Sequence, residues 1–300
     1  MYKVRNIVLM ICSLIVVFQP ACKGSSQQQT ASEQGQEGAV NASLPVSGAI
    51  YFVENSSGDL KRADLNTKEV TTIATFLDSQ NHLTELDAIA VDVAAGAVYL
   101  NSGVDIIRVD LSTKTSTTVA TGFDPHPSTI FVEGNGTALI GQSDNTISRL
   151  DLATGQNTLV VSSIPEYTAP AMLSDLVSDG NVVYAAFYSV GEVRAVLLSD
   201  GSDSLVLSVG SMNPRRGVTS IRLSSDKKYL YALAPRSGGD SSQSDTLVTK
   251  FDLTAKTSQD IVTFPSFCWG LDLNAQETKA YAACTSAIYE VDLATGQQQI

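Results

Sequence analysis

The residues best suited to acid–base or metal chemistry are two histidines. Among its 300 residues the chain has only His82 and His126, and the carboxylates of Asp78, Glu85 and Asp124 stand close to them in the sequence. Imidazole beside carboxylate can hold a divalent metal or exchange a proton near neutral pH. The spacing forms no compact ligand motif, so two solvated loop histidines are the competing interpretation.

Five further residues could recognise a ligand or partner. Arg215 and Arg216 form a guanidinium pair that could bind a carboxylate or phosphate in two-point fashion, although solvated loop charges are the alternative. Glu166, Tyr167 and the lone Trp269 offer a carboxylate and two aromatic rings suited to a sugar or peptide, while a core position is the alternative for Trp269. With the two histidines, these residues are our candidates for partner-binding loops. We assign no catalytic or metal-ligating residue.

A repeated phrase identifies the elements that must position these residues. An aliphatic strand ends in Asp-Leu and is followed by a short polar turn. The phrase is centred on Asp64, Asp110, Asp151, Asp252 and Asp292, with a degenerate copy at Leu197, at intervals of 46, 41, 46, 55 and 40 residues. Six repeats of this length, built of short strands, predict an all-β fold, a six-bladed β-propeller with four antiparallel strands in each blade.

The second copy shows the expected blade most clearly. Residues 86–92, 97–101, 105–111 and 116–120 read as its innermost, second, third and outermost strands. The first copy lacks an obvious innermost strand. We expect residues 40–44 to supply it, or blade one to have three strands.

The repeated aspartate has a structural explanation. An Asp where a strand enters a turn accepts backbone N–H groups from the residues that follow. We therefore expect Asp64 and its equivalents to hold turns rather than to react.

The repeats resemble the six-bladed families of the NHL, YVTN and TolB type and the gluconolactonase group. The resemblance covers residues 49–300 and rests on the Asp-Leu-x-Thr-Gly turn and on second strands containing Val98-Tyr99, Val183-Tyr184, Leu230-Tyr231 and Ala280-Tyr281. These motifs imply the fold and carry no catalytic residue. The gluconolactonase group holds a divalent metal with Glu, Asn and Asp. In this sequence that pattern could be matched only by Glu54, Asn101 and either Asp144 or Asp179, and no flanking motif supports the match.

The resemblance also implies where a ligand would lie. Propellers bind ligands at the channel mouth, on loops that join an outer strand to the next innermost strand or a second strand to a third. His82, His126, Glu166, Tyr167, Arg215 and Arg216 fall in such loops. A Gly/Ser-rich insertion at 236–245 lies in another and accounts for the longest interval.

The N-terminus reads as an export signal. Lys3 and Arg5 precede an apolar run at 7–18 that is too short to span a bilayer. Gln19-Pro-Ala-Cys22 resembles a bacterial lipobox, which implies cleavage after residue 21 and a lipid on Cys22; the departure is Gln19, where the family has an aliphatic residue. Ordinary secretion and an uncleaved anchor are the alternatives. Residues 22–46 are polar and predict a disordered tether, followed by the propeller at 47–300.

The remaining cysteines, Cys268 and Cys284, lie symmetrically about the expected hairpin turn of blade six. In a regular hairpin they face each other, and an exported chain meets an oxidising compartment, so we expect a disulfide rather than two buried thiols.

These features favour a binding or assembly module at the cell envelope, lipid-anchored at the outer membrane or periplasmic face, that is not an enzyme and needs no cofactor. Its partner would be a protein or the cell wall. A net charge of −12 disfavours nucleic acid. The alternatives are a metal-dependent hydrolase or lactonase with its site at the channel, and an inert surface coat.

Overall fold

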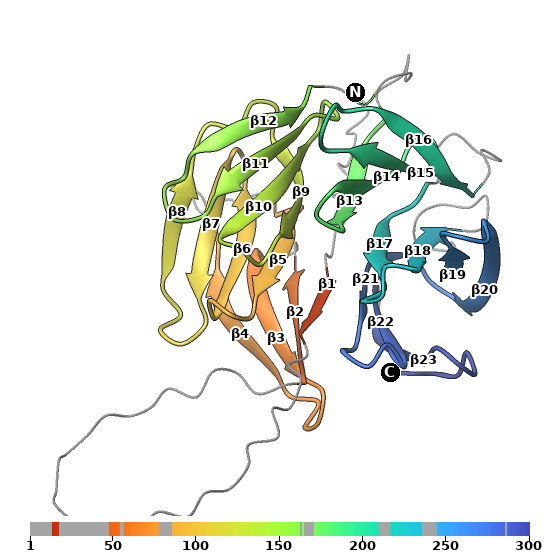
Figure 1. Cartoon of the computed structure of the whole chain (residues 1–300). Helices are drawn as coiled ribbons and strands as arrows, with labels where there is room; N and C mark the ends of the chain where they lie inside the picture. Colours follow the sequence, from red (N-terminus) through yellow and green to blue (C-terminus); the bar gives the residue numbers. More distant parts are fainter. Residues whose placement is uncertain are drawn as a thin grey trace, which may run out of the picture.

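The fold is a β-propeller of six blades. The computed structural model describes residues 14–17 (backbone only), 48–54, 57–77, 86–162, 164, 171–209, 217–235, 245–285 and 287–300. They form six separate sheets, each of four antiparallel strands, set around a central axis (Figure 1). Within these ranges we find no helix long and apolar enough to cross a bilayer. The predicted fold class is confirmed.

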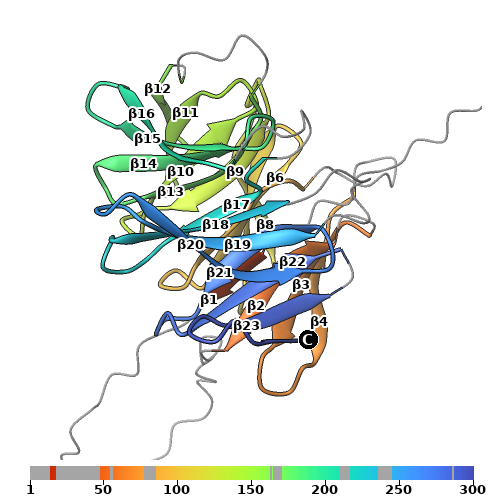
Figure 2. The same ribbon diagram turned by 90° about the vertical axis from the view of Figure 1, so that its right-hand side faces the viewer.

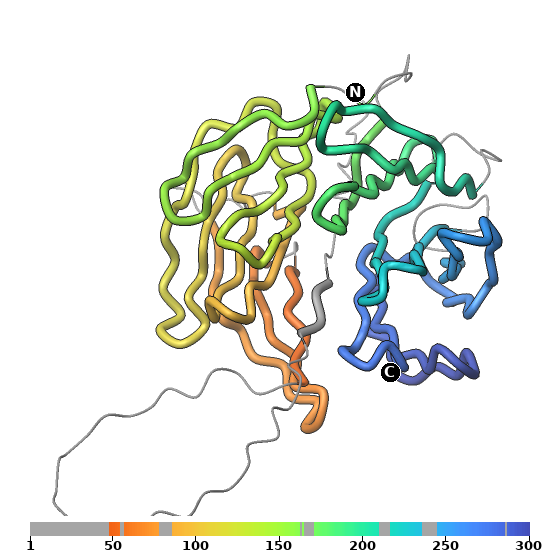
Figure 3. Tube along the Cα trace, in the orientation of Figure 1, coloured from red at the N-terminus to blue at the C-terminus, as the bar shows by residue number. Residues whose placement is uncertain are grey.

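The blades follow one another along the chain, each from its innermost to its outermost strand (Figure 3). Blades one to three are β1 Leu14–Val17, β2 Ala49–Glu54, β3 Asp59–Asp64, β4 Val70–Thr75; β5 Ile89–Asp92, β6 Ala97–Ser102, β7 Asp105–Asp110, β8 Ser116–Ala120; and β9 Pro127–Val132, β10 Thr137–Gln142, β11 Ile147–Asp151, β12 Asn157–Val161. Blades four to six are β13 Leu173–Ser178, β14 Val182–Phe187, β15 Glu192–Leu197, β16 Asp203–Ser208; β17 Ser220–Leu223, β18 Tyr229–Pro235, β19 Thr246–Asp252, β20 Thr257–Phe264; and β21 Cys268–Leu273, β22 Lys279–Cys284, β23 Ile288–Asp292, β24 Gln298–Gln299.

The core lies between neighbouring blades. The second strand of a blade is packed on both faces, and in β6 only the last residue escapes full burial. Such strands are near-continuous apolar runs, whereas the outermost strands β8 and β12 are mostly exposed, and β8 is mostly polar. Leu139 of blade three and Leu176 of blade four belong to one buried cluster. Each large aliphatic side chain removed from water contributes about 1.5–3 kcal/mol.

The repeated aspartates hold the turns after the third strands, as expected. The Oδ1 atom of Asp64 accepts hydrogen bonds from the backbone N–H groups of Asn66 and Thr67, at 2.9 and 3.1 Å. The same pair of bonds recurs at Asp110, Asp151, Asp252 and Asp292. Blade four has Leu197 at this position. There the Oδ1 atom of Asp200 accepts a hydrogen bond from the backbone N–H of Ser202 instead, at 2.9 Å.

Blades one and six close the ring by side-chain packing. They do not share a sheet, because β1 to β4 form one sheet and β21 to β24 form another. A small buried cluster joins Ile50 of β2 to Tyr281 and Ala283 of β22. Figure 2 shows blade six beside blade one. The outermost strand of blade six, β24, has only two residues.

The innermost strand of blade one is not where the sequence analysis placed it. Leu14–Val17 pairs antiparallel with β2 as the innermost strand, so blade one has four strands; residues 40–44, where we expected this strand, lie outside the described residues. The physical reason lies in composition, because residues 14–17 are apolar at every position, whereas Asn41 and Ser43 interrupt the later segment. The strand also lies outside the range 47–300 expected for the propeller, within the segment read as an export signal.

Candidate functional site

One face of the ring gathers the starts of the innermost strands and the turns that join second strands to third strands. In every blade the innermost strand begins on the same face as the turn between the second and third strands, because neighbouring strands are antiparallel. We call this the mouth face. Tyr188 lies in the β14–β15 turn and Phe267 immediately precedes β21, so both belong to it.

An aromatic cluster lies on the mouth face. The rings of Phe267 and Trp269 have centroids 4.4 Å apart, and those of Tyr188 and Trp269 lie 5.8 Å apart and tilted by 33°. Phe267 is 2 % exposed, whereas Tyr188 and Trp269 are only partly buried. A buried ring therefore supports two rings that remain open to solvent, an arrangement suited to contact with another molecule. Trp269 is accordingly neither a pure core residue nor a freely solvated one.

A bulge in β21 places Trp269. Cys268 lies opposite Cys284 and Gly270 opposite Ala283, so Trp269 is an extra residue without a partner in β22. Bulges of this kind redirect a side chain at the end of a strand. The predicted disulfide between Cys268 and Cys284 is confirmed, and it clamps the strand next to the bulge.

Gly217 lets the Tyr188 turn come close. A Cβ atom at this position would lie 1.7 Å from the carbonyl oxygen of Tyr188, so only glycine permits the two backbones to touch. The segment before β21 is fixed as well. The Thr246 hydroxyl donates to the Ser266 carbonyl at 2.9 Å and accepts the N–H of Cys268 at 3.0 Å. The aromatic cluster is thus held rigidly by its surroundings.

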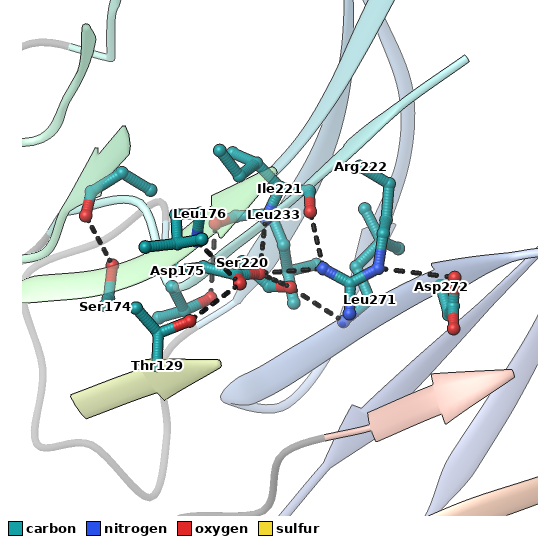
Figure 4. A network of polar contacts seen from close by, with 12 residues as sticks. Thr129, Ser174, Asp175, Leu176, Ser220, Ile221, Arg222, Leu233, Leu271 and Asp272 are labelled. Atoms are coloured by element: carbon teal, nitrogen blue, oxygen red, sulfur yellow. Dashed lines mark hydrogen bonds and ion pairs between the residues drawn. The ribbon is translucent and has the colours of Figure 1, made fainter. Parts of the chain in front are cut away.

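A network of polar contacts links four innermost strands below this face (Figure 4). The Oδ2 atom of Asp175, in β13, accepts hydrogen bonds from the Ser220 hydroxyl at 2.6 Å, the Ile221 N–H at 2.9 Å and Arg222 Nη1 at 2.9 Å. The other carboxylate oxygen receives the Thr129 hydroxyl of β9 at 3.4 Å. These contacts join blades three, four and five.

Arg222 extends the network to blade six. Its Nε atom donates to Asp272 of β21 at 3.2 Å (Figure 4). Burial acts to lower the pKa of Arg222, but the charges of Asp175 and Asp272 outweigh it, so the pKa lies above its ordinary value. The guanidinium is therefore permanently charged and shared between two carboxylates. This arrangement fixes neighbouring blades to one another, and its carboxylates are engaged as ion-pair partners.

Sequence reasoning missed both the network and two members of the aromatic cluster. The usable signal for the network was a single charge inside a short apolar innermost strand, as at Arg222 between Ile221 and Leu223. A buried charge requires a partner of opposite sign, and the neighbouring blades offer Asp175 and Asp272 in equivalent strands. Tyr188 and Phe267 carried no such signal.

Most of the candidate partner-binding residues are not among those described. The described residues do not include His82, Glu166, Tyr167, Arg215 and Arg216, nor the lipidation candidate Cys22. His126 is described and exposed, just before β9, where its carbonyl accepts the N–H of Ser143 at 3.1 Å. Trp269 is the candidate that the structure places in a cluster of side chains.

The Glu, Asn and Asp set that fitted the gluconolactonase pattern has other partners. The buried amide of Asn101 accepts the N–H groups of Asp87 and Ala88, both at 2.8 Å, and donates to the Pro127 carbonyl. Glu54 bonds Lys61 and Ser57. Among described residues, no three His, Cys, Asp or Glu side chains converge in a way that could hold a metal ion.

Comparisons with known proteins find likeness in structure only. No family model and no curated protein sequence matches the chain. A solved structure of a nidogen/laminin complex superposes with a TM-score of 0.61 at 12% identity, over 81% of this chain and 89% of that one. A protein of unknown function from Bacteroides thetaiotaomicron gives 0.61 at 12% identity, over 81% and 66%. An oligogalacturonate lyase with manganese gives 0.51 at 14% identity, over 84% and 73%. At these identities the likeness shows the β-propeller fold.

Proposed function

We propose that this protein is a binding module of the cell envelope that takes a protein partner on its mouth face. The observation that carries the proposal is the aromatic cluster, in which Tyr188 and Trp269 remain partly exposed on a rigid support. Rigid, partly exposed aromatic side chains bury much area at little cost in conformational entropy, and they dominate the energy of many interfaces.

The surroundings of the cluster support a protein partner. Met172, which lies on the same face, is 39 % exposed although it is apolar. The carbonyl of Met172 accepts the N–H of Tyr188 at 2.8 Å, so this exposed side chain adjoins the cluster. A fold neighbour in a nidogen/laminin complex shows that a propeller of similar shape occurs in a protein assembly.

The proposed location follows from the N-terminus. A lipid on Cys22, after export and cleavage, would anchor the propeller to the outer membrane or the periplasmic face of the envelope. The lipobox-like sequence before Cys22 and the polar stretch after it support this part of the proposal.

Photo-crosslinking in cells that make the protein tests the docking face. We would place p-benzoylphenylalanine at Met172 of the full-length chain, which leaves the three rings intact. The same group at Lys114, an exposed turn residue on the opposite face, is the control. We expect a crosslinked protein of defined mass from position 172 and none from position 114.

Variants then test the cluster itself. Replacing Trp269 with alanine should weaken binding of the purified partner at least tenfold, whereas Tyr229→Ala, which removes a half-buried ring from β18, should leave it unchanged. Equal crosslinking from both faces, or equal affinity of both variants, would contradict the proposal. A stoichiometric divalent metal in the purified protein, with turnover of lactones, would instead support a metal-dependent hydrolase.

A further inference from the structure

The mouth face carries charge of one sign. Its segments join second strands to third strands and outermost strands to the next innermost strands, with the strand residue at each end included. Among the described residues of these segments the charged side chains, apart from His126, are all carboxylates, and none is a lysine or arginine. The most exposed of the carboxylates are Asp124, Asp144 and Asp245.

The opposite face is mixed in sign. Exposed lysines lie in its turns beside the repeated aspartates; they include Lys68, Lys114, Lys227 and Lys256. Lys61, which lies inside β3, forms ion pairs with Glu54 at 2.5 Å and Asp59 at 3.6 Å and so neutralises part of the charge of blade one. The described part of the mouth face is therefore negative over the blades that follow.

Asp245 adjoins the aromatic cluster. It is exposed and directly precedes Thr246, the first residue of β19. The Thr246 hydroxyl contacts both the Ser266 carbonyl and the N–H of Cys268, in the segment that leads into Trp269. A carboxylate of blade five thus stands beside the half-buried indole of blade six.

A second carboxylate lies on the blade-four side of the cluster. Glu192 begins β15, immediately after the turn that carries Tyr188. It forms an ion pair with Arg194 at 3.2 Å, which compensates part of its charge. Of the two acidic residues, Asp245 is therefore the better placed to meet a charge brought by a partner.

Aromatic faces and carboxylates attract the same kind of group. The face of an indole ring carries partial negative charge and attracts an ammonium or guanidinium group placed over it. Carboxylates around the ring strengthen that attraction and repel phosphate, sulfate or uronate groups. Acidic polysaccharides and nucleic acids therefore fit this surface poorly, whereas a basic stretch of protein fits it well.

We propose that the mouth face recognises a segment of its partner rich in lysine or arginine. One cationic side chain lies over Trp269 and a second pairs with Asp245, while Asp124 and Asp144 draw the segment toward the face by long-range attraction. This inference rests on the proposed function, since it states the chemistry of the protein that the mouth face takes.

Peptide binding to the protein purified from membranes in detergent tests the preference for positive charge. The probe is a fluorescein-labelled 12-residue peptide of alternating Lys and Ser, and the matched probe has acetyl-lysine at every Lys. Fluorescence anisotropy should show binding of the first peptide and about tenfold weaker binding of the second, and salt at about 0.3 M should weaken the first. Equal binding of the two peptides, or no binding of either, would overturn the proposal.

Two substitutions with the same change of charge test the location. Asp245→Asn, like Trp269→Leu, should raise the dissociation constant of the lysine peptide about threefold or more. Asp200→Asn removes one charge from an exposed turn of the opposite face and keeps an acceptor for the N–H of Ser202, so it should leave the constant unchanged. Equal weakening by the two Asn variants would mean that the peptide is attracted by the acidic chain as a whole, and the proposal would be wrong.

Crosslinking in cells separates this inference from the proposed function. With p-benzoylphenylalanine at Met172, Asp245→Lys should abolish the crosslink to the partner, whereas Asp200→Lys should keep it; thermal melts establish that both variants fold. A crosslink that survives Asp245→Lys would refute the basic segment and leave the docking face in place. If position 172 gives no crosslink without either substitution, the proposed function fails and this inference fails with it.

Discussion

The guanidinium of Arg222 lies 2.9 Å from the carboxylate of Asp175 in the preceding blade. The same guanidinium reaches Asp272 of the following blade at 3.2 Å. One side chain in a four-residue strand thereby ties three innermost strands together. Removal of the positive charge would leave two partly buried carboxylates facing each other.

Arg222→Met should therefore destabilise the protein by about 3–5 kcal/mol. Removing one member of a buried ion pair leaves the buried carboxylates without the positive charge that compensated them. The measurement is urea unfolding followed by circular dichroism. Lys228→Met is the control, since Lys228 pairs with Asp226 on the surface, with side chains 64% and 45% exposed. It should leave the unfolding midpoint nearly unchanged, because solvent screens a surface ion pair. Equal midpoints for the two variants would show that the Arg222 network adds nothing to stability.

Reduction of the disulfide between Cys268 and Cys284 should cost about 3 kcal/mol, the loop-closure entropy for a separation of 16 residues. Thermal melts with and without dithiothreitol measure it. The double variant Cys268→Ala, Cys284→Ala should melt at the reduced protein's temperature and ignore the reductant. A wild-type melting curve that does not respond to complete reduction would contradict this expectation. Because the disulfide adjoins the Trp269 bulge, reduction should also weaken partner binding.

Stability should fall in acid through the turn aspartates. The backbone N–H of Thr67, the Arg62 guanidinium and the backbone N–H of Asn66 lower the pKa of Asp64 from 3.8 to about 2. A carboxyl whose pKa is depressed in the folded state stabilises the protein fully above its unfolded pKa, and the contribution disappears as pH falls through the folded value.

Melting temperatures should therefore be insensitive to the Asp64 proton above about pH 5 and decline between about pH 4 and 2. Asp64→Asn keeps an acceptor oxygen but has no proton to gain, so its melting temperature should decline less steeply over that range. Identical slopes for the variant and the wild type would rule out Asp64 as a contributor.

Gly217→Ala should destabilise the protein by about 1–3 kcal/mol and weaken partner binding, because the new methyl group meets the Tyr188 carbonyl and displaces the turn that carries the ring. Gly103→Ala is the comparison. Its added Cβ meets nothing within 4 Å, and its φ of 59° costs about 1–2 kcal/mol without touching the cluster. Only the first variant should change affinity; a loss of affinity in both would point to a general folding defect.

Cys22→Ser should abolish the lipid anchor. Metabolic labelling with an alkyne fatty acid followed by membrane fractionation measures it. We expect labelled, membrane-bound wild-type protein, and a variant that carries no label and keeps its signal segment. An unlabelled wild type, released in soluble form, would favour ordinary secretion.

Features of the fold that repeat or lie close in the chain were predictable from the sequence. The period of 40–55 residues predicted the blades, because every blade must bury the same kind of apolar second strand and end its third strand in the same turn. The aspartate turns and the disulfide followed from contacts within one turn or one hairpin, where antiparallel pairing determines the partner. Trp269 was singled out by residue type alone.

Other features depend on curvature around the ring. Arg222 and Asp175 are 47 residues apart and Tyr188 is 81 residues from Trp269, so only the closing of blades around an axis brings them together. The innermost strand of blade one was misplaced because Leu14–Val17 lies far from β2 in the chain, and only the tertiary structure pairs the two segments. The sequence by itself thus determined the repeat, its turns and its disulfide, which arise from local pairing. Only the tertiary structure decided the inter-blade network, the aromatic cluster and the closure of the ring, because these are contacts between repeats that local patterns do not encode.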